Sequence, residues 1–228
     1  MISINGMTIS YDGKTNVIDG LNLTLVENQI HGIVGLNGAG KTSMLRAIFG
    51  LVKADSGLCN FHDETLSKKH IAFLPTENYF FPNITGNEYL ALFKNQDFDL
   101  KGWNDLFQLP LDRIIDDYST GMKKKLALIG ILKMDKPVLI LDEPFNGLDI
   151  ETGRILRSIL LKLKQKGKTI IVTSHIIETL TNMCDQIHYL ESGIIQFSKN
   201  EDEFGSFETE LFEKLEEQNR DAIEGLIS

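Results

Sequence analysis

The chain has 228 residues, of which 42% are hydrophobic and 24% charged, and its formal net charge is −9 at pH 7. This length suits one large α/β domain, and no apolar run approaches the roughly 18 residues that a membrane-spanning helix needs. The acidic balance argues against a nucleic-acid partner, which would require a basic surface. Because the first residues lack the basic and apolar regions of a signal peptide, we expect a cytoplasmic protein.

Residues 2–27 alternate apolar and polar side chains in two runs, with turn residues at 12–14 and at 19–20. This pattern predicts antiparallel strands with one exposed face. Ile30–Val34 is then expected to form a short buried strand, and Ser43–Phe49 a helix. The segment that joins them, Gly35–Thr42, matches G-x-x-x-x-G-K-[ST] at every position.

This joining segment is predicted to wrap a phosphate chain. Its glycines, Gly35, Gly38 and Gly40, let backbone N–H groups turn inward, and the N-terminus of the following helix adds partial positive charge. Lys41 supplies a full charge to the terminal phosphates, and the Thr42 hydroxyl can ligate Mg²⁺.

The remainder alternates predicted strands and helices. Strands are expected at 70–74, 138–141, 169–173, 187–190 and 194–197, and helices within 83–135 and at 150–166 and 176–183. Continuous apolar strands favour a mostly parallel sheet buried on both faces. We therefore predict an α/β phosphate-loop NTPase core in residues 1–200, with an antiparallel N-terminal β subdomain and a helical insert at about 76–135. The isolated Cys59 and Cys184 are expected to be reduced thiols.

Residues 201–228 hold ten acidic and two basic residues, so most of the negative charge lies in this C-terminal segment. Its apolar residues Phe204, Phe207, Leu211 and Leu215 recur at helical spacing. The segment is therefore predicted to be an acidic helical tail that packs on the body of the protein. A regulatory or partner-binding role is the alternative.

Three further features narrow the class of NTPase. Asp142 and Glu143 directly follow a buried strand, where carboxylates face the crevice beside a phosphate loop. Asp142 is therefore a candidate Mg²⁺ ligand, and Glu143 a candidate general base. His175 follows the strand at 169–173 and should emerge at the same edge. Ser119 is a predicted helix N-cap that forms an anion-binding start with Gly121.

These motifs, in this order and spacing, resemble the ATP-binding subunit of ABC transporters, and the likeness covers residues 1–197. The resemblance implies catalytic roles for Lys41, Glu143 and His175, Mg²⁺ ligation by Thr42 and Asp142, and a D-loop Asp149 at a dimer interface. It also implies that Tyr11 stacks on adenine and that Ser119 and Gly121 reach the nucleotide of the opposite subunit. The loop that binds ATP would comprise Gly35, Asn37, Gly38, Ala39, Gly40, Lys41, Thr42 and Ser43.

The resemblance further implies a homodimer or paired ATPase subunit that sandwiches ATP and Mg²⁺. It would be peripheral on the inner face of the membrane, bound to separate integral membrane transporter subunits. The signature Tyr118–Met122 and the short build look more like bacterial export-type subunits.

The chain departs from the family at one metal ligand. Similar subunits carry a glutamine where this chain has Thr76, followed by Glu77. Threonine is shorter, so we expect the Mg²⁺ contact to be lost or bridged by water, unless Glu77 substitutes. The signature also has Thr120 and Met122 in place of the commoner glycine and glutamine.

The segment Tyr79-Phe80-Phe81-Pro82 has two open interpretations. In the family this region faces a groove that receives a helix of the membrane subunit, and the alternative is core packing of the insert. The motifs leave two other functions to compare. A non-transport ATPase of the same fold could switch an envelope or assembly partner. A GTPase or kinase is disfavoured, since the guanine-reading Asn-Lys-x-Asp is absent.

Overall fold

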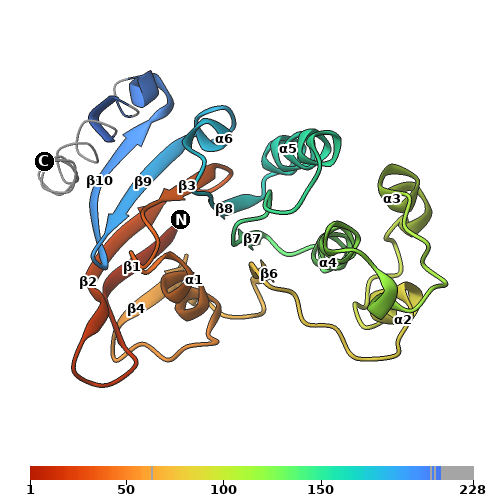
Figure 1. Cartoon of the computed structure of the whole chain (residues 1–228). Coiled ribbons are helices and arrows are strands. Elements are labelled where there is room, and N and C mark those ends of the chain that lie inside the picture. Colours follow the sequence, from red (N-terminus) through yellow and green to blue (C-terminus); the bar gives the residue numbers. More distant parts are fainter. Residues whose placement is uncertain (63, 206, 208, 212–228) are drawn as a thin grey trace, which may run out of the picture.

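The computed structural model describes residues 1–62, 64–205, 207 and 209–211. Its elements along the chain are β1 (Ile2–Ser10), β2 (Asn16–Leu25), β3 (Ile30–Val34), α1 (Lys41–Phe49), β4 (Ser56–Phe61), β5 (Glu64–Thr65), β6 (Ile71–Leu74), α2 (Gly86–Ala91), α3 (Leu100–Phe107), η1 (Ile115–Asp117), α4 (Thr120–Lys133), β7 (Val138–Leu141), α5 (Ile150–Gln165), β8 (Thr169–Thr173), α6 (Ile177–Thr181), β9 (Gln186–Glu191), β10 (Ile194–Asn200) and η2 (Glu201–Glu203). The predicted α/β class is confirmed (Figure 1).

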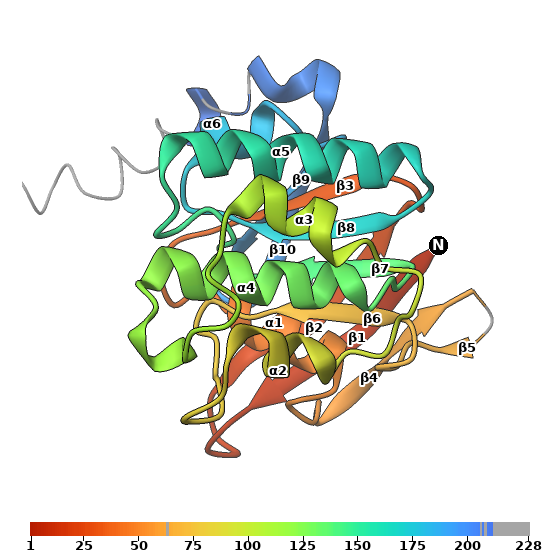
Figure 2. The same cartoon turned by 90° about the vertical axis from the view of Figure 1, so that its right-hand side faces the viewer.

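Two sheets organise the molecule. A six-stranded sheet has the order β10-β9-β3-β8-β7-β6, in which only the β10–β9 pair is antiparallel. A four-stranded antiparallel sheet has the order β2-β1-β4-β5. Helix α1 lies between the two sheets, while α4 and α5 lie on the other side of the large sheet, with α2 and α3 beyond α4 (Figures 1 and 2).

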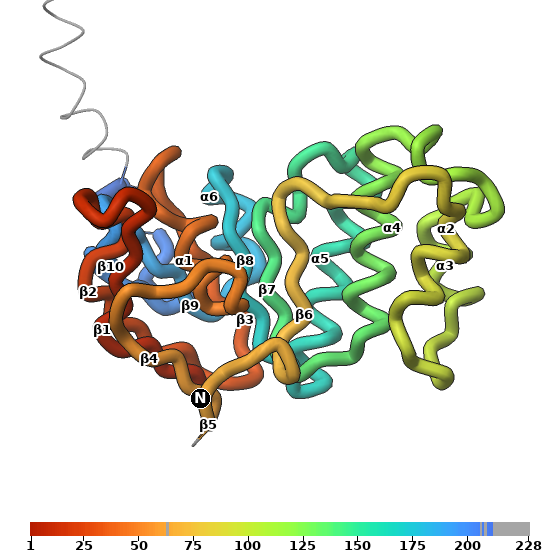
Figure 3. Tube along the Cα trace, turned by 90° about the horizontal axis from the view of Figure 1, so that it is seen from below, coloured from red at the N-terminus to blue at the C-terminus, as the bar shows by residue number. Residues whose placement is uncertain are grey.

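Strands β6 and β7 are apolar at every position because both faces of the sheet are buried there. In β7, Leu139 and Leu141 contact the core on the side of α4 and α5. Val138 and Ile140 of the same strand contact the second core, formed with α1 and the antiparallel sheet. Figure 3 shows these layers from below, with the small sheet at one side of the molecule and α2 and α3 at the opposite side.

Two details of the N-terminal sheet differ from the prediction. Asp19-Gly20 is not a turn, because β2 runs through it from Asn16 to Leu25. Gly20 has a φ of 60°, and the pairing of β1 with β2 shifts register between Met7 and Ile9, so the Asp-Gly pair marks an irregular step inside a strand. Strands β4 and β5 were not predicted, since most of their residues are exposed and carry no alternating apolar signal.

The predicted C-terminal stripe packs on the body, as expected. Phe204, Phe207 and Leu211 are buried and belong to the core of α4 and α5. Leu215 lies outside the described residues.

In the part of the chain that the structure describes, no helix combines the length and apolarity needed to span a bilayer. Cys59 and Cys184 are free thiols, and burial raises the pKa of Cys59 to about 12.

Candidate active site

The loop between β3 and α1 depends on its glycines. A β carbon on Gly35 would lie 2.3 Å from the Leu190 carbonyl oxygen, and one on Gly40 would lie 2.7 Å from Ile18 Cδ1. Gly40 and Gly38 have φ values of 105° and 83°, which side chains rarely allow. A β carbon on Gly38 would have no neighbour within 4 Å. The loop is thus tightly seated against β9 and open beside Gly38, as a phosphate cradle requires.

Lys41 begins α1 and lies over this loop. Its Nζ donates hydrogen bonds to the carbonyl oxygens of Gly35 (2.6 Å) and Leu36 (3.2 Å). Partial burial lowers the pKa of Lys41, and the carboxylates of Glu143 and Asp142 oppose that shift. The N–H groups of the first turn of α1 have no partners within the helix. The ammonium and these N–H groups make the site suited to an anion.

Thr42 and Asp142 are brought together from 100 residues apart in the sequence. Thr42 Oγ1 donates to Asp142 Oδ2 (2.8 Å), and Thr173 Oγ1, at the end of β8, donates to Asp142 Oδ1 (2.8 Å). Asp142 is only 1% exposed. A hydroxyl and a carboxylate at this separation are the oxygen ligands that Mg²⁺ prefers, so the residues fit the ion.

Glu143 and His175 also meet, as predicted from their positions after neighbouring strands. His175 Nδ1 lies 3.1 Å from Glu143 Oε2, and the two side chains are 54% and 13% exposed. The Glu143 N–H donates to Thr173 Oγ1 (2.8 Å). Thr173 thus connects the candidate base to the candidate metal ligand. Sequence reasoning missed Thr173, although its place at the end of a strand beside 138–141 was a usable signal.

Sequence reasoning also missed Lys124, which follows the signature two residues after Met122. Its side chain is buried, and Nζ donates to the carbonyl oxygens of Glu143 (2.6 Å) and Asn146 (3.1 Å). Burial lowers the pKa of Lys124, opposed by the carboxylates of Glu143 and Asp142. No spacing rule predicts this contact, because it joins α4 to the segment after β7.

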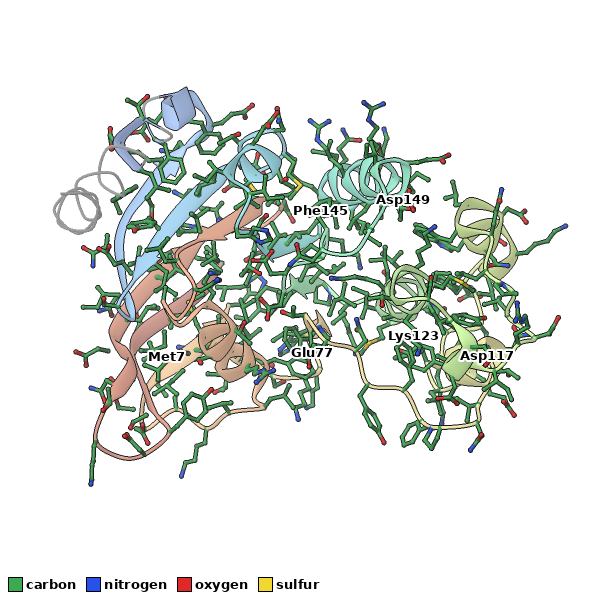
Figure 4. The ribbon with its side chains drawn as sticks, viewed as in Figure 1. Met7, Glu77, Asp117, Lys123, Phe145 and Asp149 are labelled. Carbon is green, nitrogen blue, oxygen red and sulfur yellow. The ribbon has the colours of Figure 1, made fainter. Side chains whose placement is uncertain are left out.

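Ser119 is a helix N-cap, as expected, and Asp149 is the N-cap of α5. Ser119 Oγ accepts from Met122 N (3.2 Å) at the start of α4. Asp149 accepts from Thr152 N (2.8 Å) at the start of α5, and hydrogen bonds from Thr152 lower the pKa of Asp149 to about 2. Lys123 and Asp149 are labelled near these helix starts in Figure 4.

The starts of α4 and α5 are neighbours in space. A β carbon on Gly121 would lie 3.2 Å from the Gly147 carbonyl oxygen, and Lys125 Nζ lies 3.6 Å from Asp149 Oδ2. Among the described residues, no hydrogen bond joins Ser119 or Gly121 to the phosphate loop of the same chain. The loop leads into α1 and the signature begins α4, and these two helices lie on opposite sides of the large sheet (Figure 1), so within one chain they are separate surfaces.

Tyr11 lies beside the start of α1. It follows β1 and is 61% exposed, and its hydroxyl donates to Ser43 Oγ (3.1 Å). The ring is thus held at the phosphate loop with most of its surface free, as an adenine platform requires.

Thr76 and Glu77 line a cavity of about 360 Å³ with Thr120, Lys123 and Lys124 of α4. Glu77, on the segment after β6, is labelled in Figure 4. The structure thus places the segment that replaces the family glutamine against the signature helix.

The aromatic segment divides between the two interpretations. Phe80 packs against the core, with its ring 4.9 Å from that of Tyr89. Tyr79 and Phe81 are 78% and 56% exposed and contact each other edge to face. Core packing therefore accounts for Phe80 but not for its two neighbours.

Comparisons with known proteins identify the family and the fold of the chain. Residues 18–146 match the family model described as ABC transporter. The chain is 29% identical to the ABC transporter ATP-binding protein YtrB of Bacillus subtilis, over 96% of this chain and 81% of that protein. A solved ATP-binding subunit of an ABC transporter superposes with a TM-score of 0.83 at 24% identity, covering 89% of this chain and 91% of that one. The dimeric, post-hydrolysis ATP-binding cassette MJ0796 bound to ADP and Pi superposes with a TM-score of 0.78 at 22% identity, covering 88% and 99%.

Proposed function

Because the chain belongs to the ABC transporter family as an ATP-binding protein, we propose that it hydrolyses ATP as a nucleotide-sandwich dimer and powers a separate membrane-spanning transporter. One observation carries the proposal: a continuous set of hydrogen bonds runs from Thr42 through Asp142 and Thr173 to Glu143, and Glu143 contacts His175. This set connects the phosphate loop to a candidate base.

The proposed step is attack of water on the terminal phosphorus of ATP, with ADP as the leaving group. The Glu143 carboxylate accepts the proton of the water, and the contact with His175 orients the carboxylate. Lys41 neutralises charge on the phosphates, and the ring of Tyr11 stacks on the adenine of ATP. Thr42 and Asp142 would hold Mg²⁺, which when bound neutralises phosphate charge. A positioned general base contributes about 10²–10⁴-fold to such a rate.

The dimer follows from the separation of the two surfaces within one chain. Ser119 and Gly121 would complete the nucleotide site of a second copy, and Asp149 would lie at the interface. The dimeric form of the MJ0796 cassette with ADP and Pi supports this arrangement by fold likeness.

The proposed membrane partner binds at the exposed Tyr79 and Phe81, since exposed aromatic side chains that contact each other favour a protein interface. The protein would then be peripheral on the cytoplasmic face of the membrane. We further propose that residues 1–200 are the ATP-binding domain, with the helical insert at about 76–135, and that 201–228 is an appended tail.

The test is Glu143→Gln in the full chain. The variant should bind ATP, lose turnover by about 10²-fold or more and accumulate as a dimer on size-exclusion chromatography with ATP and Mg²⁺. Glu64→Gln makes the same change on an 82% exposed carboxylate of β5 and should behave as wild type. Hydrolysis by Glu143→Gln at the wild-type rate would remove Glu143 from its role.

The partner is tested by pull-down from membranes. The wild-type chain should retain an integral membrane protein, and the Tyr79→Ser/Phe81→Ser double variant should lose it while keeping ATPase activity. Retention by the double variant would contradict this docking surface. Identifying the retained protein as a non-transporter would favour the mechanical-switch function.

A further inference from the structure

Lys124 is a buried cation that no proposed step uses. It lies on α4, five residues after Ser119, and is 5% exposed. Its ammonium donates to two main-chain oxygens, of Glu143 at 2.6 Å and of Asn146 at 3.1 Å. Neither oxygen carries a full charge, so this is not an ion pair, and the contact spans the turn that follows the candidate base.

The backbone that Lys124 holds is strained. Glu143 has a φ of 51°, in the left-handed region that residues with a β carbon rarely adopt. Such a conformation persists only where the surroundings determine it. Here the Glu143 N–H is held by Thr173 Oγ1, and its carbonyl oxygen is held by Lys124 and, at 3.3 Å, by Asn146 N.

We propose that Lys124 is a positioning residue for Glu143: its ammonium keeps the turn at 143–146 in the conformation that aims the Glu143 carboxylate toward the phosphate loop. Because Lys124 lies on the helix that begins with Ser119 and Gly121, it also connects the signature rigidly to the base. The inference rests on the proposed function, in which Glu143 is the base.

The alternative is that Lys124 only satisfies buried carbonyl oxygens. The chain offers a matched control for this alternative. Lys133, on the same helix, donates to the Leu90 carbonyl oxygen at 3.0 Å and is far along α4 from Glu143. Removing either ammonium deletes a lysine–carbonyl contact of α4, but only one of the two contacts reaches the proposed base.

The experiment compares Lys124→Met, Lys133→Met and Lys124→Arg in the full chain. Lys124→Met should lower kcat by about 10- to 100-fold, as misplacement of a catalytic group does, and change the KM for ATP and the affinity for a fluorescent ATP analogue by less than about threefold. Lys133→Met should keep the wild-type kcat. Lys124→Arg keeps a charged donor and should recover most of the rate.

Adding Lys124→Met to Glu143→Gln should cause no further loss, because two residues that act through one group are not additive. If the circular dichroism spectrum of Lys124→Met differs from that of wild type, Lys124→Gln takes its place, since the glutamine amide can still donate to these carbonyl oxygens. Lys124→Gln should give a kcat between those of Lys124→Met and wild type.

Several results would overturn the inference. They are an unchanged kcat in Lys124→Met, an equal fall in Lys133→Met, or a loss of nucleotide affinity that accounts for the whole effect. The same assay tests the proposed function separately. If Glu143→Gln hydrolyses ATP at the wild-type rate, the proposed function fails, whatever Lys124→Met does.

Discussion

A buried pair of histidines should make the folded state sensitive to mild acid. His31 of β3 and His188 of β9 are 0% and 1% exposed, and His31 Nδ1 lies 3.2 Å from His188 Nε2. His31 Nε2 must donate to the Val26 carbonyl oxygen (2.8 Å), so His31 Nδ1 accepts from His188, and His188 Nδ1 accepts from Ser198 Oγ (2.7 Å). Every ring nitrogen is satisfied with both rings neutral.

The size of the stability loss in acid follows from the pKa of His188. Burial, together with the charge of His31, lowers the pKa of His188 from 6.5 to about 3. Between these values the unfolded chain binds a proton that the folded chain does not, so stability is complete above the unfolded pKa and falls as the pH falls. At about pH 5.5 the loss from His188 is about 1.4 kcal/mol. Burial also lowers the pKa of His31, which adds a loss of the same sign.

The assay is urea unfolding at about pH 8 and about pH 5.5, above the range in which ordinary carboxyl groups titrate. Wild type should lose at least about 1.4 kcal/mol between the two, and His188→Gln should lose about 1.4 kcal/mol less than wild type does. His62→Gln changes a histidine whose side chain is 58% exposed and should keep the wild-type difference. Equal losses in wild type and His188→Gln would refute the reasoning.

Three further predictions concern the tail, the adenine platform and the position of the family glutamine. Phe207 is fully buried, so Phe207→Ala should lower the free energy of unfolding by about 3–5 kcal/mol in urea, and a loss below about 1 kcal/mol would contradict its place in the core. Tyr11→Ala should raise the Kd for ATP measured by calorimetry, whereas Tyr11→Phe keeps the ring and should stay within about threefold of wild type. Thr76→Gln should lower the Mg²⁺ concentration for half-maximal ATPase activity, since glutamine reaches further. Unchanged activity and Mg²⁺ dependence would show that the position is not a ligand.

Local patterns predicted the elements whose signal is carried by consecutive residues. The loop Gly35–Thr42 needs glycines at fixed positions, and β7 is apolar throughout because both of its faces are buried. The strands β4 and β5 lacked such a signal because most of their side chains are exposed. Asp19-Gly20 was misread as a turn because the same dipeptide also suits an irregular step inside a strand.

In the candidate site, too, some residues were predictable from local sequence and others depend on the tertiary structure. Asp142, Glu143 and His175 were predictable because the carboxyl ends of parallel strands meet at one edge of a sheet. That Thr173 links Asp142 to Glu143 depends on the register of β7 beside β8, which no single strand encodes.

The sequence by itself thus determined that a phosphate loop is followed by an acidic strand end and a later histidine, because each motif is a short run of backbone and side-chain requirements. Only the tertiary structure decided that Lys124 of α4 holds the backbone of Glu143. The two residues are 19 positions apart in the chain, one on α4 and the other just after β7. The contact exists because the packing of α4 beside the segment after β7 buries an ammonium next to two main-chain oxygens that accept its hydrogen bonds.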